Sequence, residues 1–173
     1  MLSDMDAPGV VVIGSANLDI VVPVPHHPVT GETVMGGDHA LVPGGKGANQ
    51  AVAAARMGAV SMMVGKVGGD IFGPQLLDGL TAAGVDISGV SVNPDVSSGI
   101  AVIGVDETAQ NCITQILGAN DTCGPEQAQT VKRELPGAAG LLLQLETSIA
   151  VSMEVAMEAI SVGVRVILDP GPV

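Results

Sequence analysis

The amino-acid sequence predicts an α/β fold with a parallel sheet. Short, continuous apolar runs such as GVVVI (Gly9–Ile13) are typical of strands that are buried on both faces. These runs alternate with segments of helical periodicity that end at a glycine. Because β-α-β order joins parallel strands through right-handed crossovers, the alternation indicates helices on the faces of one sheet.

The predicted elements follow one another in a regular order. The first strand, Gly9–Ile13, ends at Gly14. Gly47–Met57 is predicted to be a helix, since its apolar residues recur at helical spacing until Gly58. The remaining predicted elements are the strand Val60–Val67, the helices Pro74–Ala83 and Gln127–Leu135, the strand Leu141–Leu145, the amphipathic helix Ile149–Ser161 and the strand Val164–Leu168.

Two stretches, Ile20–Val42 and Gly99–Leu117, break this order. The prolines of the first stretch suit edge strands better than central ones. The second has the pattern of a hairpin, in which Gly99–Val105 and Asn111–Leu117 flank a polar turn. We expect the two stretches to form a small antiparallel sheet, a lid laid over the main sheet.

Composition and charge exclude several classes of function. Six Lys and Arg residues against 18 Asp and Glu residues give a formal net charge of −12, so nucleic acids and anionic membrane surfaces would be repelled. Phe72 is the one aromatic residue, which leaves no platform for stacked bases. The first residues carry no basic charge, and no apolar run reaches the ~20 residues of a transmembrane helix. We therefore expect a cytoplasmic protein.

Several other residues are expected to have structural roles. Cys112 and Cys123 do not form a CxxC pair and are expected to be free thiols. With almost no aromatics, the core must be aliphatic, and four methionines are expected to fill gaps in it: Met62, Met63, Met153 and Met157. Three histidines lack partners at ligand spacing, so no metal site is predicted at them: His26, His27 and His39. Asp70 is expected to be a loop or capping acid.

A glycine-rich segment before the helix Gly47–Met57 is the first candidate site. Gly44 and Gly45 allow the backbone to approach a ligand closely, with N–H groups pointing at it. Lys46 and Asn49 are three residues apart on the first helical turn and therefore share a face. This arrangement suits hydroxyl groups or anions, although a glycine turn with a solvated lysine would have the same sequence.

Two further candidates follow predicted strands. Asn17 and Asp19 come after the first strand and alternate with apolar residues, a pattern that an Asx turn would also explain. Glu146 directly follows the predicted strand Leu141–Leu145. The alternative is that it caps the next helix. Because open α/β sheets bind ligands at the carboxyl ends of their strands, the three segments are expected to meet in one polyol-binding cleft.

The common nucleotide-binding motifs do not fit the glycine-rich segment. A Walker A loop would need Gly at Ala40 and Ser or Thr at Gly47. The dinucleotide fingerprint G-x-G-x-x-G would need Gly at Gln50. A dinucleotide-dependent dehydrogenase is therefore only weakly supported.

The order and content of these segments resemble the ribokinase-like carbohydrate kinase family. GGKGANQA is the most specific match, and the resemblance covers essentially all 173 residues. The matching strings are VVVIGSANLDIVV, PVTGETVMGG, PGGKGANQAVAAARMGA, KVGGDIFGPQLLDGL, SSGIAVIGVDETAQNCI, LGAN, LLLQLE and the closing DPGP.

The resemblance implies a fold, a reaction and an assembly. Residues 1–173 would be the N-terminal part of one Rossmann-like α/β domain, with lid segments at about 20–42 and 99–117 inserted. The implied reaction transfers the γ-phosphoryl group of ATP to the 5-hydroxyl of D-ribose, with Mg²⁺ and K⁺ as further cofactors. The lid implies a homodimer through paired lid sheets.

By position, the resemblance also implies which residues bind the sugar. These residues are Asn17, Asp19, Gly44, Gly45, Lys46, Asn49, Ala101, Ile113 and Glu146. Pro43 departs from the aromatic or small residue usual in the family, and Asp169 and Gly171 depart from the usual NPAP turn. None of these departures falls on an implied sugar contact.

The family's G-A-G-D string, which carries the anion hole and the catalytic Asp, does not occur in this sequence. The resemblance therefore implies that the catalytic Asp lies beyond Val173, together with the residues that bind ATP and the cations, and no catalytic residue is assigned in this chain. We expect the chain to be the sugar-binding half of a ribose kinase and to be inactive by itself. The alternatives are another sugar or nucleoside kinase of the family, or a non-catalytic sugar-binding remnant.

Overall fold

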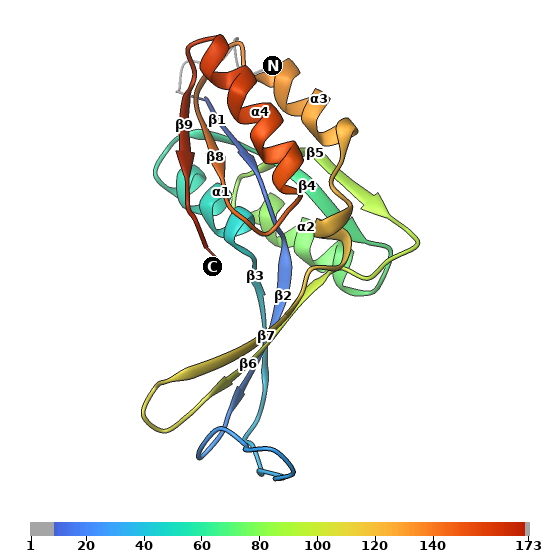
Figure 1. Cartoon of the computed structure of the whole chain (residues 1–173), viewed down its shortest axis with the longest axis vertical. Coiled ribbons are helices and arrows are strands. Elements are labelled where there is room, and N and C mark those ends of the chain that lie inside the picture. Colours follow the sequence, from blue (N-terminus) through green and yellow to red (C-terminus); the bar gives the residue numbers. More distant parts are fainter. Residues whose placement is uncertain (1–8, 172–173) are drawn as a thin grey trace.

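The computed structural model describes residues 9–171, in which a narrow β arm projects from an α/β body (Figure 1). The body contains one five-stranded sheet in the order β5-β4-β1-β8-β9, and every pairing in it is parallel. The strands are β1 (Gly9–Ile13), β4 (Val60–Gly68), β5 (Asp86–Asn93), β8 (Ala138–Leu143) and β9 (Arg165–Leu168). The predicted α/β class with a parallel sheet is confirmed.

Helices cover both faces of this sheet. The helices α1 (Lys46–Arg56) and α2 (Phe72–Ala82) pack on one face, and α3 (Pro125–Glu134) and α4 (Ile149–Ser161) pack on the other (Figure 1). The central strand β1 serves both cores, because Val12 belongs to the first and Val11 and Ile13 to the second. Burial on both faces explains why this strand is a continuous apolar run.

The expectation that all four methionines fill the core is wrong for two of them. Met62 and Met63 on β4 are buried, but Met153 and Met157 on α4 are 60% and 68% exposed. The helix α4 buries Val151, Val155 and Ala159 and also carries apolar residues on its outward face, so it is not amphipathic as predicted. Among residues 9–171, no helix has the length and apolar character needed to cross a membrane.

The strand β5 has no counterpart among the elements predicted from the sequence. It pairs with β4 at the edge of the sheet, and its residues are mostly half-buried or exposed. Asp86, Ser88 and Ser91 interrupt its apolar residues, and Gly89 lies close against Met63 O of β4. An edge strand of this kind lacks the continuous apolar run by which the buried strands are recognised.

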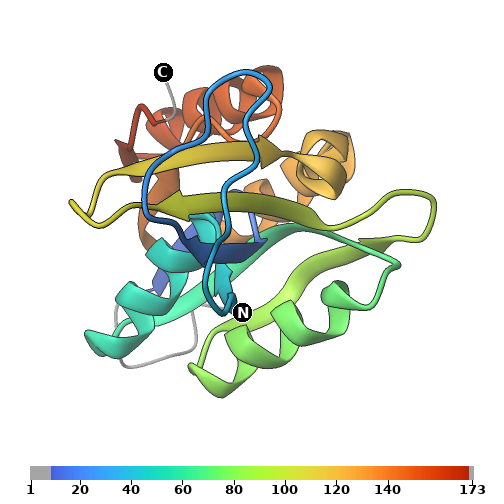
Figure 2. The same cartoon turned by 90° about the horizontal axis from the view of Figure 1, so that it is seen from below.

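The arm is a second, four-stranded sheet, called the lid below. Its strands are β2 (Asn17–Pro23), β3 (Ala40–Gly44), β6 (Gly99–Val105) and β7 (Asn111–Ile116), in the order β3-β2-β6-β7. The pairs β2–β3 and β6–β7 are antiparallel, but β2 and β6 run parallel. The lid is therefore a mixed sheet and not purely antiparallel as expected, because two hairpins lie side by side in the same direction. Figure 2 shows it from the end of the arm, in front of the body.

Alternate residues of the lid strands face opposite sides. Asp19, Ala101 and Gln115 are in register across three strands and face the cleft described below. The opposite side, called the outer lid face, is formed by the residues that alternate with them: Ile20, Val22, Leu41, Val102, Cys112, Thr114 and Ile116. Leu41, Val102 and Ile116 are each more than 40% exposed, so this apolar face has no cover within residues 9–171.

Candidate active site

A cleft of about 300 Å³ lies at the seam between the lid and the body. Its lining brings together eight of the nine residues implied by the family resemblance, from β2, α1, β6, β7 and the loops before α1 and after β8. The lining residues are Asn17, Asp19, Gly45, Lys46, Asn49, Ala101, Ile103, Ile113, Gln115 and Glu146.

The start of β2 delivers Asn17 and Asp19 to the cleft. Leu18 between them is 1% exposed and packs into the body core beside Leu76 of α2. Because strand residues alternate sides, burial of Leu18 directs both neighbours to the cleft side. The predicted alternation is present, but these residues belong to a lid strand rather than to a loop after β1.

The glycine-rich segment makes a close turn from β3 into α1. Gly45 has φ +92°, and a Cβ there would lie 2.8 Å from Asn17 N and Ser15 O, so only glycine fits without strain. Gly44 lies against Asp19, where a Cβ would overlap the carboxylate. Gly44 does not line the cleft itself. It lines a neighbouring, largely apolar cavity of about 310 Å³ between α1 and α2.

Glu146, in the loop after β8, is held from three sides. The Ser15 hydroxyl donates a hydrogen bond to its Oε2, and Lys46 N donates to the same oxygen at 3.1 Å. Lys46 Nζ lies 3.9 Å from Glu146 Oε1. Ser15 is fully buried and Glu146 is 4% exposed, so the carboxylate is fixed in place before any ligand arrives.

Two carboxylates and one ammonium group set the electrostatics of the cleft. Burial raises the pKa of Asp19, the nearby Glu146 carboxylate raises it further, and Lys46 lowers it in part. The charged form of Asp19 is therefore under-stabilised in the cleft, and hydrogen-bond donors of a ligand would stabilise it. Hydroxyl groups, which donate without adding charge, are suitable partners for both carboxylates.

The lid covers the cleft mainly with aliphatic side chains. Ala101 and Ile113 lie there as the resemblance implies, and Ile103 and Gln115 join them. Sequence reasoning missed these last two residues, although strand alternation from Ala101 and Ile113 leads directly to them. Aliphatic side chains opposite polar ones suit a ligand with one apolar face and several hydroxyl groups.

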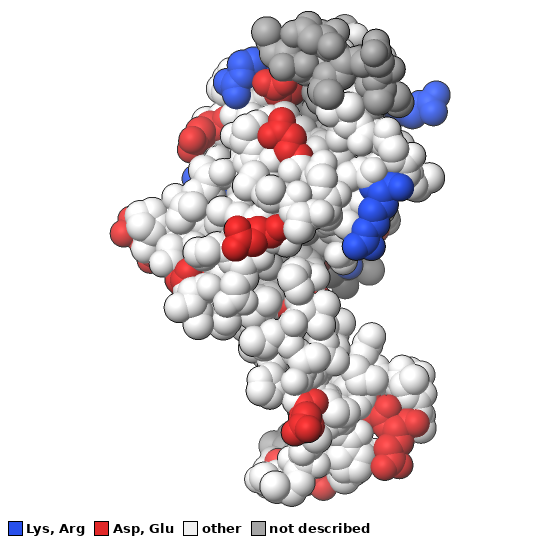
Figure 3. Space-filling view, turned by 180° about the vertical axis from the view of Figure 1, so that it is seen from behind, with Lys and Arg blue, Asp and Glu red and all other residues white. Residues whose placement is uncertain are grey.

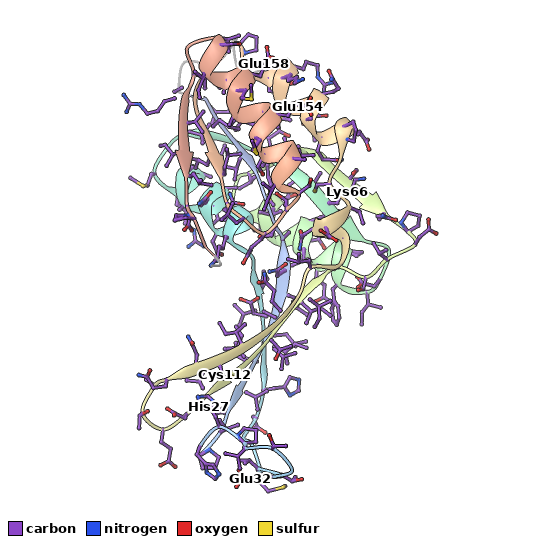
Figure 4. The ribbon with its side chains drawn as sticks, in the orientation of Figure 1. His27, Glu32, Lys66, Cys112, Glu154 and Glu158 are labelled. Carbon is purple, nitrogen blue, oxygen red and sulfur yellow. The ribbon has the colours of Figure 1, made fainter. Side chains whose placement is uncertain are left out.

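His26 and His27, at which no metal site is predicted, do not line the cleft. His26 Nε2 lies 3.0 Å from Glu32 Oε1 and His27 Nε2 lies 3.7 Å from Asp106 Oδ2, and Figure 4 shows His27 and Glu32 on the outer arm. Within residues 9–171, no group of three His, Cys, Asp or Glu side chains is placed to hold a metal ion.

The catalytic Asp that the family resemblance implies is not among the residues of the cleft described above. The resemblance places it beyond Val173, and Val173 itself lies outside the described residues. Its position therefore stays a prediction. The acids that do line the cleft, Asp19 and Glu146, are the two that the resemblance assigns to sugar binding.

The two cysteines and Asp70 have structural surroundings. Cys112 is exposed on the lid (Figure 4) and Cys123 is buried, and both are free thiols as expected. Burial raises the pKa of Cys123 to about 11, which makes it an inert thiol. Asp70 accepts from Phe72 N and Gly73 N at the start of α2, so the expected capping role is confirmed.

The sequence is similar to known proteins over nearly its whole length. The family model for pfkB family carbohydrate kinases matches residues 7–170. The ribokinase of Bacillus subtilis is 41% identical over 161 residues, which cover 93% of this chain and 55% of that protein. A deoxyribokinase of Salmonella typhi is 36% identical and covers 94% of this chain and 53% of that protein. The chain thus spans about half the length of the curated relatives it matches.

Solved structures agree with this relationship. The structure of Arabidopsis thaliana ribokinase complexed with ribose and ATP superposes with a TM-score of 0.81 at 33% identity, covering 96% of this chain and 55% of that one. The ribokinase of Cryptococcus neoformans in complex with ADP gives a TM-score of 0.86 at 28% identity, covering 96% of this chain and 52% of that one. Sequence, fold and the position of the cleft residues lead to one conclusion: this chain belongs to the pfkB family of carbohydrate kinases.

Proposed function

We propose that the cleft binds D-ribose and that the whole protein transfers the γ-phosphoryl group of ATP to the sugar's 5-hydroxyl. The observation that carries this proposal is the meeting of Asn17, Asp19, Lys46 and Glu146 under an aliphatic lid surface, in a space of about 300 Å³. The relatives named ribokinase and the Arabidopsis structure with ribose and ATP support it.

Each cleft residue has a role that follows from its chemistry. Asp19 and Glu146 accept hydrogen bonds from sugar hydroxyls, and Lys46 and the Asn49 amide donate to sugar oxygens. Ala101 and Ile113 pack on the sugar ring and exclude water, which strengthens these polar contacts. None of them is assigned to proton transfer, because their work is to hold the sugar.

We propose ATP, Mg²⁺ and K⁺ as cofactors of the whole protein. When bound, they supply the phosphoryl group and neutralise the charge that develops during its transfer. Residues 9–171 offer no metal-binding cluster, and Lys46 is the one cation lining the cleft. Because the family's G-A-G-D string does not occur in this sequence, we expect the cleft residues to bind sugar alone and ADP release by the 173-residue chain to stay at background level. A coupled ADP-release assay with ribose, ATP, magnesium and potassium measures this directly.

Titration calorimetry with D-ribose tests the sugar-binding proposal. Asp19→Ala removes two charge-assisted hydrogen bonds, at ~1.5 kcal/mol each, and should weaken affinity about a hundredfold. Asp38→Ala is the matched control, since Asp38 is an exposed lid acid that does not line the cleft. Equal affinities of the wild type and Asp19→Ala would refute the assignment of the cleft to ribose.

The relatives named deoxyribokinase make 2-deoxy-D-ribose the competing substrate. The two sugars differ by one hydroxyl, and a cleft built to bond that hydroxyl rejects the analogue that lacks it. Competition between them in the same titration decides which sugar the cleft prefers, and tighter binding of the deoxy sugar would overturn the ribose proposal.

We also propose that the outer lid face pairs with the same face of a second copy, giving a homodimer. Its exposed aliphatic residues form a contiguous apolar surface, which single protomers rarely leave in water. A twofold axis would place this patch against itself without adding a new surface.

A further inference from the structure

Asn120 is a fully buried residue outside the cleft. It contacts the lid root, the end of the lid at which β2 and β6 begin and β7 ends. It lies in the 3-10 helix η2 (Gly118–Thr122), directly after the last lid strand. Its carboxamide is surrounded by backbone and side-chain groups of Ala16, Asn17 and Leu117. Neither the charge pattern nor the cleft lining points to this residue, yet it is the polar group that joins the first and last strands of the lid.

The partners of Asn120 fix which end of its carboxamide is which. Ala16 N is a donor only and lies 3.0 Å from Asn120 Oδ1. Leu117 O is an acceptor only and lies 2.9 Å from Asn120 Nδ2. Because the two ends of a carboxamide are distinguished only by such partners, Asn120 has one allowed orientation, with its NH₂ group toward Asn17.

This orientation in turn fixes Asn17. Asn120 Nδ2 donates to Asn17 Oδ1 at 2.8 Å, so the carbonyl end of Asn17 is occupied. Asn17 lines the cleft, and its Nδ2 makes no hydrogen bond within residues 9–171. The amide end is therefore the end left for a ligand. The hydrogen bonds thus form a chain of donors with one direction: Ala16 N donates to Asn120, Asn120 donates to Asn17, and Asn17 is left to donate into the cleft.

Gly99, at the start of β6, leaves the space that this chain of donors requires. A Cβ there would overlap both Asn17 Oδ1 and Asn120 Nδ2. Three strand roots, those of β2, β6 and β7, thus meet at a single amide–amide contact.

We propose that Asn120 is a positioning residue that makes Asn17 an obligate hydrogen-bond donor to a sugar oxygen. The sugar as ligand rests on the proposed function, but the orientation of the two amides does not. Asn120 never touches the ligand. It acts by excluding the flipped Asn17, which would present an acceptor beside the two cleft carboxylates.

Side-chain amide NMR of the chain labelled with ¹⁵N-asparagine tests the orientation without any ligand. The NH₂ protons of Asn120 should exchange slowly, since they are buried and bonded, and those of Asn17 should exchange faster. Signals are assigned from the variants Asn17→Ala and Asn120→Ser. The opposite order, with Asn17 protected and Asn120 exchanging, would overturn the proposal whether or not the chain binds sugar.

A double-mutant cycle on D-ribose affinity tests the positioning role. Asn120→Asp keeps the acceptor for Ala16 N but loses the donor, so it repels Asn17 Oδ1 and should weaken binding roughly tenfold. In the Asn17→Ala background the same change should alter affinity less than about twofold, because its target is gone. Asn111→Asp adds the same charge at an exposed lid position and should leave affinity unchanged.

The outcomes separate the two proposals. Equal tenfold losses in both backgrounds would mean that Asn120 acts on the lid as a whole, and the positioning role would be wrong while ribose binding stands. No ribose binding by the wild-type chain would contradict the proposed function, and the exchange experiment would still decide the orientation. If Asn120→Asp does not fold, Asn120→Ser replaces it in the cycle with the same expected pattern.

Discussion

The body and the lid contribute to the same cleft in different ways. Body residues are fixed before a ligand binds, as Glu146 is by Ser15 and by Lys46 N. Beyond its root, the lid contributes side chains from strands with little burial, such as β7, where five of six residues are exposed. The polar groups of the cleft therefore lie in the body and at the lid root, whereas the outer lid covers the cleft.

Charge is divided between the two regions as well. All six Lys and Arg residues belong to the body, and residues 17–44 and 99–116 contain none. Figure 3 shows acidic but no basic side chains on the arm. A phosphate group is therefore expected to approach the cleft from the body side, where Lys46 lies, and not across the lid.

The largest expected effect comes from the contact that joins α1 to the end of β1. A Cβ on Gly47 would lie 2.7 Å from Gly14 C and Cα and from Ser15 N, all backbone atoms. Gly47→Ala should therefore cost about 3 kcal/mol or more of unfolding free energy, measured by urea denaturation. An unchanged unfolding free energy would contradict the view that the body is more rigid than the lid.

Gly79→Ala is the matched control in the neighbouring helix. A Cβ there meets nothing closer than Pro43 at 3.8 Å, and it would enter the cavity between α1 and α2. Since Ala is the better helix former, this variant should gain about 0.5–1 kcal/mol. Changes of opposite sign in the unfolding free energy of the two variants would confirm that the backbone contact, and not helix propensity, determines the effect of Gly47→Ala.

A second prediction concerns the tie between the body and the lid root. Asp70 caps α2 and also accepts from Ser98 N at 2.8 Å and Ser98 Oγ at 2.7 Å, just before β6. Asp70→Ala should cost about 2 kcal/mol. Asp106→Ala removes a similar set of bonds in the exposed hairpin turn and should cost clearly less. Equal losses of unfolding free energy for the two variants in urea titrations would mean that the contact of Asp70 with Ser98 adds no stability beyond that of an exposed turn.

The same tie depends on pH in a definite direction. Partial burial acts to raise the pKa of Asp70, but hydrogen bonds from Ser98, Gly73 and Phe72 outweigh it and the pKa is lowered. A depressed carboxyl pKa contributes stability above the unfolded value of 3.8 that is lost as pH falls through the folded pKa. The difference between wild type and Asp70→Ala should therefore shrink below about pH 4.

A third prediction separates the two faces of the lid. Val102→Lys places a charge on the outer lid face and should convert the proposed dimer to a monomer in light scattering. Ile113→Lys places the same charge on the cleft side and should leave the proposed dimer intact while blocking the proposed ribose binding. Body stability should change by less than about 0.5 kcal/mol in both. A wild-type chain that is monomeric at micromolar concentration would contradict the dimer.

The smallest expected effect is the release of electrostatic strain at Asp19. Because its pKa is raised by burial and by Glu146, Asp19 destabilises the folded chain at neutral pH, and Asp19→Asn should unfold at slightly higher urea. The gain should vanish as pH falls toward 3.8, where wild-type Asp19 is protonated. A variant that is less stable than wild type at pH 7 would show that Asp19 has a structural partner.

Much of this architecture could be predicted because it depends on local pattern. The bounds of β1 and α4 agree with the predicted ranges. Eight of the nine residues implied by the family resemblance meet in the cleft, and four of these eight come from the lid strands β2, β6 and β7. Sequence reasoning missed Asn120 and Ser15, whose roles depend on contacts more than 100 residues away. It also predicted a purely antiparallel lid, because the parallel pairing of β2 with β6 joins segments about 80 residues apart in sequence.

The parallel pairing of β2 with β6 has a consequence for how the chain folds. The two strands are about 80 residues apart in sequence, and β4, α2 and β5 lie between them. Closing so long a loop is entropically costly until the intervening unit is compact. We therefore expect the intervening unit of β4, α2 and β5 to fold before β2 and β6 pair, so that the proposed ribose affinity returns during refolding only after β4 is protected from hydrogen exchange.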